Sequence, residues 1–184
     1  DGPGCRSDLP QVGCTGNRMF LGDGKGRFTD ATDRFGVRDG YWGWGAVGQD
    51  LNDDGHRDLF HVNGFRELGG QYGQTDERSA TYRAHFDQDP NRLYLGNPDG
   101  AWPEAAELVG IRDRTNGKGV VAFDADGDGD LDLVLATTEG PPVLYRNDTP
   151  AGPDNHRLTI RLRQPTGPNR FAIGAEVYAD LGDG

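Results

Sequence analysis

The nine residues from Asp124 to Asp132 constrain this chain most, because five of them are aspartates. Carboxylates so close together repel one another unless a cation lies between them. Oxygen-bearing side chains at positions 1, 3 and 5, a glycine at position 6 and an acid at position 9 suit the oxygen-rich shell of Ca²⁺. The stretch therefore predicts a calcium loop.

The same pattern begins at Asp50, 74 residues before Asp124. The helix-flanked calcium loop has a bidentate Glu at position 12, but here that position is His61 in the first copy and Leu135 in the second. The acid at position 9 is then expected to supply the last ligand. Short apolar runs follow each loop and favour strands rather than helices. The alternative is a pair of solvated acidic turns without metal.

The repeat extends beyond the two loops. The segments 17–22 and 91–96 both begin Asn-Arg and are also 74 residues apart, and a third copy starts at 143–147. Tyr145 follows Tyr94 by only 51 residues, so the first unit carries an insertion of about 23 residues within 64–90. Several short strands per repeat of about 50 residues predict an all-β fold of propeller-like blades, with too few blades here to close a ring.

The composition agrees with this prediction and narrows the function. Thirty Gly and eleven Pro in 184 residues favour short strands and tight turns. A net charge of −11 argues against nucleic-acid binding, and no apolar run reaches the roughly 20 residues of a membrane helix. Calcium loops of modest affinity and the cysteine pair Cys5 and Cys14 favour an extracellular or periplasmic protein with one disulfide.

Residues 17–147 resemble the FG-GAP/VCBS repeats of calcium-binding propellers, on the basis of the Asp-x-Asn/Asp-x-Asp-Gly-x-x-Asp loops and the Gly-rich strands before them. The resemblance implies two Ca²⁺ sites. Their side-chain ligands would be Asp50, Asn52, Asp54 and Asp58, then Asp124, Asp126, Asp128 and Asp132, with the carbonyl groups of His56 and Asp130.

The last part of the chain differs from the repeats. Its segment 169–177, Asn-Arg-Phe-Ala-Ile-Gly-Ala-Glu-Val, resembles the signature of the ASPIC/UnbV module, and 155–162 alternates as a strand does. We therefore expect three parts: a disulfide-linked loop at 1–16, the repeats at 17–150 with their insertion, and a truncated β-rich ASPIC/UnbV-like module at 151–184.

These features predict a calcium-stabilised module for binding or adhesion rather than an enzyme. The polar and aromatic insertion 64–90 is the expected contact for a protein or carbohydrate partner. Two alternatives stay open. One is a polysaccharide-acting enzyme that uses Tyr82 or His85, and the other is a subunit that self-assembles through open strand edges.

Overall fold

The computed structural model describes residues 16–64, 89–138, 140–150, 152 and 157–180, and within them it is almost entirely β-structure. The elements in chain order are β1 (Phe20–Gly22), β2 (Phe28–Asp30), α1 (Thr32–Phe35), β3 (Gly43–Gln49), β4 (Asp58–Asn63), β5 (Arg92–Tyr94), β6 (Gly117–Phe123), β7 (Asp132–Thr137) and β8 (Val143–Tyr145). The predicted all-β class is confirmed.

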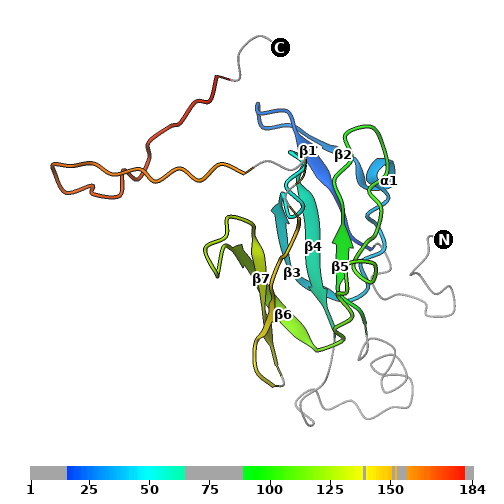
Figure 1. The fold of residues 1–184 in the computed structure, drawn as a ribbon. Coiled ribbons are helices and arrows are strands. Elements are labelled where there is room, and N and C mark those ends of the chain that lie inside the picture. The colour runs from blue at the N-terminus through cyan, green and yellow to red at the C-terminus, as the bar shows by residue number, and fades with distance from the viewer. Residues whose placement is uncertain (1–15, 65–88, 139, 151, 153–156, 181–184) are drawn as a thin grey trace, which may run out of the picture.

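The strands form three small antiparallel sheets, ordered β1-β2, β3-β4-β5 and β6-β7-β8. Each sheet is a simple meander of consecutive strands, and the sheets follow one another in space as they do in sequence (Figure 1). An isolated bridge between Tyr94 and Glu104 adds the beginning of a fourth strand to the middle sheet. This arrangement is consistent with part of a propeller-like fold.

The two three-stranded sheets repeat the same backbone in detail. Each pairs the strand before an acidic loop with the strand after it, Gln49 with Asp58 and Phe123 with Asp132. Each also has an irregularity in register near its first glycine, Gly43 in one sheet and Gly117 in the other. The sequence repeat of 74 residues is therefore a structural repeat.

The main hydrophobic core lies between these two sheets. It is built from alternate residues of the strands, as expected where one face of a sheet is covered; its buried members are Leu51, Phe60, Val62, Leu93, Ala106, Ile111, Leu133 and Leu135. A second cluster joins the first sheet and α1 to the middle sheet through Ala31, Phe35, Val37 and Tyr94.

Glycine allows β3 and β6 to approach closely. A Cβ atom on Gly45 would lie 3.0 Å from the Cα of Gly119, and one on Gly117 would lie 2.8 Å from the Cβ of Val62. Larger side chains at these positions would push the sheets apart. The Gly-rich strands noted in the sequence therefore set the distance between the repeats.

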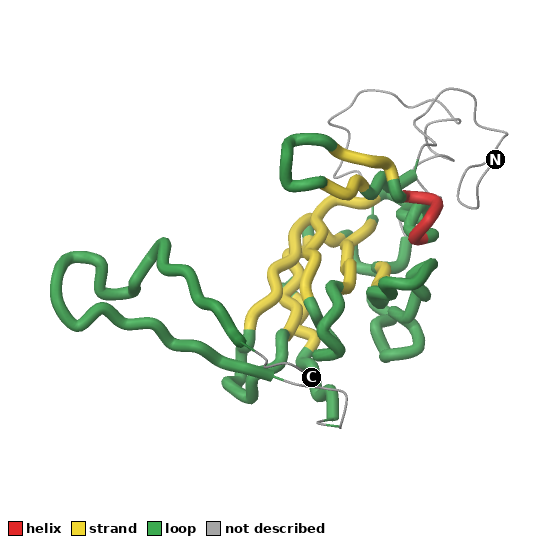
Figure 2. Tube along the Cα trace, turned by 90° about the horizontal axis from the view of Figure 1, so that it is seen from above, coloured by secondary structure: helices red, strands yellow, loops and turns green. Residues whose placement is uncertain are grey.

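Beyond the third sheet, residues 157–180 extend away from the sheets as an arm (Figures 1 and 2). The alternation at 155–162 predicted a strand, but none is assigned within the described part, 157–162. A strand is stable only when a neighbouring strand takes its hydrogen bonds. The arm is instead held by local bonds, such as that from the N–H of Gln164 to the carbonyl of Arg170 at 3.2 Å.

Candidate metal centre

The two predicted calcium loops, which we call the first acidic loop (50–58) and the second acidic loop (124–132), connect β3 to β4 and β6 to β7. Glycine at position 6 is needed in both, because Gly55 has φ 87° and Gly129 has φ 103°. Position 4 is also left-handed, with Asp53 at φ 59° and Gly127 at φ 85°. The loops thus share one backbone path.

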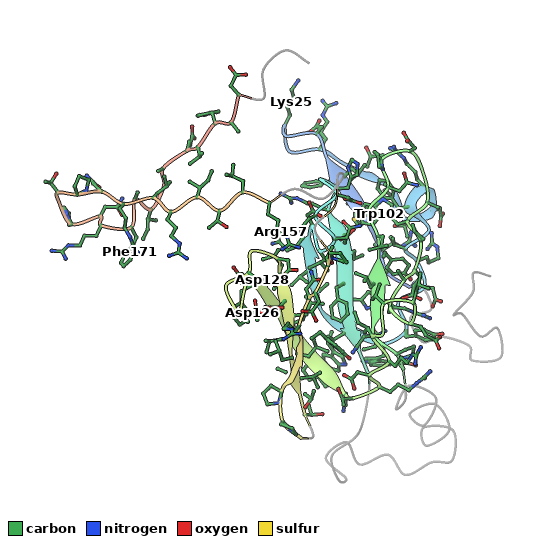
Figure 3. The ribbon with its side chains drawn as sticks, in the orientation of Figure 1. Lys25, Trp102, Asp126, Asp128, Arg157 and Phe171 are labelled. Atoms are coloured by element: carbon green, nitrogen blue, oxygen red, sulfur yellow. The ribbon has the colours of Figure 1, made fainter. Side chains whose placement is uncertain are left out.

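In the second acidic loop, three carboxylates are brought together at its exposed tip. Oxygen atoms of Asp124, Asp126 and Asp128 all lie within 4.8 Å of one another, which suits a cation bound by hard oxygen ligands. Figure 3 shows Asp126 and Asp128 side by side on this loop. The three residues that the spacing singled out as positions 1, 3 and 5 are thus grouped as a metal site requires.

Backbone N–H groups hold these carboxylates in place. The N–H of Gly127 donates to Asp124 Oδ1 at 2.7 Å, and the N–H of Asp130 donates to Asp128 Oδ1 at 3.1 Å. Hydrogen bonds from Asp130 lower the pKa of Asp128, so this carboxyl group is held in its charged form. Each oxygen has more than one lone pair and still has capacity for a cation.

The first acidic loop is tied in the same way. Asp50 accepts hydrogen bonds from the N–H groups of Asp54 (3.1 Å) and Gly55 (2.9 Å), and Asp54 accepts one from the N–H of His56 at 2.8 Å. The amide of Asn52 donates to Asp54 Oδ2 at 2.9 Å. Asn52 stands where the second loop has Asp126, so the first loop has one carboxylate fewer among these three positions.

The acids at position 9 have an additional role that the sequence did not indicate. The Asp58 carboxylate accepts the N–H of Leu51 at 2.8 Å and the N–H of Gly96, just after β5, at 2.7 Å. Asp132 likewise accepts N–H groups from its own loop and from Asn147 after β8, at 2.7 and 2.8 Å. Each carboxylate is buried and joins the loop to the third strand of its sheet.

Burial raises the pKa of Asp58, and its two N–H bonds only partly offset this effect. The neighbouring charges of Asp54 and Asp50 act in the same direction as burial. A cation in the loop would favour the charged form of all three groups.

Arg157 is a further residue of the site that sequence reasoning missed. Its Nε lies 2.6 Å from Asp53 Oδ2 in the first acidic loop, and its Nη2 lies 3.2 Å from Asp130 Oδ2 in the second. Figure 3 shows it next to the second loop. Burial raises the pKa of Asp130 to about 6, and the guanidinium group opposes this shift. Nothing in the spacing of the sequence places Arg157 there.

A third residue also connects the loops. The side-chain amide of Asn147 donates to the carbonyl of Leu51 at 2.7 Å and to that of Leu131 at 3.2 Å. The two acidic loops are therefore part of one hydrogen-bonded layer at the same end of the two sheets.

Several predicted features lie outside the described residues. These are the Cys5–Cys14 disulfide, nearly all of the insertion 64–90, and Tyr82 and His85. His61, which follows the first loop, is buried in β4. Its ring contacts Asn63 Oδ1 at 3.1 Å and Asn17 Nδ2 at 3.3 Å. Burial lowers the pKa of His61 to about 4, so the ring is neutral at pH 7.

Comparison with known proteins identifies one family. Residues 80–135 match the model of the FG-GAP-like repeat. No curated protein matches the chain at a significant level. Among the described residues, no helix has the length and apolar character needed to span a membrane. The matched range contains β5, β6, the second acidic loop and most of β7, and within it the chain carries an FG-GAP-like repeat.

Proposed function

We propose that this chain is an extracellular or periplasmic repeat module, stabilised by two bound Ca²⁺ ions, that binds a protein or carbohydrate partner. The observation that carries the calcium proposal is the grouping of Asp124, Asp126 and Asp128 at the tip of the second acidic loop. The matching backbone of the first loop supports a second site, with Asp50, Asn52 and Asp54 at the same positions.

The donors fit calcium because they are all oxygen atoms on a flexible loop, without sulfur or imidazole groups at these positions. Asp58 and Asp132 would complete the two shells from below, together with the carbonyl groups of His56 and Asp130. The ion would neutralise repelling carboxylates and so stabilise the strands on both sides of each loop. Its role would be structural.

Thermal unfolding with and without calcium tests this proposal. At a free Ca²⁺ concentration ten times the Kd, one site adds about 1.4 kcal/mol to the free energy of unfolding. For a chain of this size this raises Tm by about 3–6 °C per site. We expect chelator to remove the increase and Mg²⁺ to restore little of it. An unchanged Tm in chelator would contradict the proposal.

Two substitutions make the test specific. Asp126→Ala is expected to abolish calcium binding at the second loop, as measured by titration calorimetry, while the first loop still binds one ion. Glu107→Gln removes one exposed acid outside the loops and is the matched control. If both variants bind two ions, Asp126 is not a ligand.

The binding role rests on the sequence of the insertion and on the use of a rigid β scaffold to present it. The corresponding connection in the second repeat, residues 138–142, is short, so replacing 66–87 with it should preserve the fold. Asp89 and Asn91 must remain, because they hydrogen-bond to β3 and β4 regions at Trp42 and Asn63. The shortened protein should lose binding to extracellular-matrix glycans and proteins on an array. Binding equal to that of the unaltered chain would exclude the insertion as the contact.

A further inference from the structure

The repeated sheets each have two different faces. We call the face that carries Phe60, Val62 and Leu93 in the middle sheet the forward face, and the face that carries Leu59 and Tyr94 the backward face. The repeat places Val134, Ala136 and Leu144 on the forward face of the third sheet, with Leu133 and Tyr145 on its backward face. Strand alternation puts Val121 and Phe123 of β6 on this forward face too.

Inside the molecule, forward faces pack on backward faces. Phe60 and Val62 of the middle sheet are fully buried, and Leu93 is 5% exposed. They lie in one cluster with Leu133, which belongs to the backward face of the third sheet. The contact between the first and middle sheets follows the same rule, because Met19, the equivalent of Leu93, packs with Leu59 and Tyr94.

The forward face of the third sheet is left uncovered. Val121 is 54% exposed, Phe123 46% and Leu144 56%. The residue equivalent to Leu144 in the middle sheet is Leu93, which is almost completely buried. A contiguous apolar sheet face of this kind marks a contact surface rather than a solvent boundary.

The opposite end of the stack exposes a backward face. Phe20 in β1 is 52% exposed and Phe28 in β2 is 71% exposed. Their equivalents, 74 residues later, are Tyr94 and Trp102. Tyr94 is 3% exposed, and the ring centroid of Trp102 lies 4.9 Å from that of Phe35. The phenylalanines therefore lie where the middle sheet buries aromatic side chains.

We propose that a second copy of this chain covers the open forward face, with its Phe20 and Phe28 packed on Val121 and Leu144. The contact would repeat the internal packing of forward on backward faces. It would join the copies head to tail, because the two surfaces are at opposite ends of the molecule. The apolar sheet face and the aromatic pair bury well without unpaired charge.

The charges near the phenylalanines suit burial in the same way. Arg18 and Asp30 form an ion pair at 3.0 Å across β1 and β2. The equivalent pair in the middle sheet, Arg92 with Glu104 at 3.5 Å, lies beside the covered backward face. The first sheet thus has the same charge pairing as a sheet that is already packed. Because each copy carries a net charge of −11, salt should strengthen the association.

Sedimentation velocity of the full chain over a concentration series in Ca²⁺ and moderate salt tests the proposal. We expect concentration-dependent dimers and longer oligomers. Leu144→Asp alters only the forward surface and Phe28→Asp only the backward surface, and each variant alone should be monomeric. Both positions are exposed, so circular dichroism should show an unchanged fold. Val121→Ser and Phe20→Ser are a second pair in case an aspartate variant is unstable.

An equimolar mixture of the two variants separates this arrangement from a symmetric dimer. Each variant retains one intact surface, so the mixture should form a heterodimer that cannot grow further. A chain that is monomeric at its highest soluble concentration would overturn the proposal and leave the open face to a different polypeptide. A mixture that stays monomeric while the unaltered chain dimerises would equally overturn the head-to-tail contact.

Discussion

Replacing Asp58 by alanine should destabilise the protein even when no calcium is present. The Asp58 side chain is 1% exposed and accepts the N–H groups of Leu51 and Gly96 at 2.8 and 2.7 Å. A hydrogen bond to a charged group contributes about 1.5–3 kcal/mol, so the two bonds together contribute about 3–6 kcal/mol. The substitution also removes the cost of keeping a carboxylate buried, which is the cause of its raised pKa.

The net loss expected for Asp58→Ala is therefore about 2–4 kcal/mol in the free energy of unfolding. This corresponds to a fall in Tm of about 4–16 °C for a chain of this size. Asp58→Asn should lie between the two proteins, because the amide oxygen accepts one N–H while the amide nitrogen faces the other donor. Urea unfolding in chelator and in Ca²⁺ measures both quantities.

Asp54→Asn is the matched control. Asp54 is exposed and belongs to the same loop, but its oxygens bond only within the loop, to the N–H of His56 and the amide of Asn52. In chelator it should cost less than about 1 kcal/mol. If Asp58→Ala costs as little as this control in chelator and becomes costly only in Ca²⁺, then Asp58 acts as a metal ligand alone and the structural role is wrong.

Three other substitutions test separate features. Gly117→Ala should cost about 1–3 kcal/mol in urea unfolding, because its Cβ would lie 2.8 Å from that of Val62, whereas Gly100→Ala, in open space, should cost little; equal effects would contradict the close approach of the sheets. The pKa of His61, lowered to about 4, makes the unfolded state bind more protons between pH 4 and pH 6.5, so stability is lost as pH falls. Between pH 7 and pH 5 this loss is about 2 kcal/mol, and His61→Leu should lose that much less over the same range; identical pH profiles would refute the assignment. Arg157→Gln should lower Tm in chelator and raise calcium affinity by calorimetry, because it removes the cation that bridges the acidic loops; unchanged affinity would show that its charge does not reach the site.

Local sequence signals predicted the repeating part of the fold. The apolar runs after each acidic loop became β4 and β7, and the insertion was located by comparing two spacings. These features depend on neighbouring residues, which the sequence displays directly. The short helix α1 was not predicted, since four residues carry little periodicity and its formation depends on packing of Phe35 against Trp102.

The parts that could not be predicted depend on contacts between distant residues. The bond from Gly96 to Asp58 spans 38 positions, and the ion pair of Arg157 with Asp53 spans 104. No local pattern reports such distances. The strand predicted at 155–162 illustrates the reverse case, because alternation indicates the capacity to pair but does not supply a partner strand.

The side chain of Asn147 has a consequence for how the protein is made. Its bond to the carbonyl of Leu51 links residues 96 positions apart, so the first acidic loop lacks this partner until the third sheet is complete. During synthesis the early strands would wait for β8 to emerge, while the hairpin of β1 and β2 closes locally. Folding from the N-terminus would therefore be provisional, and the last strand of the repeat region would commit the whole layer of loops to its final form.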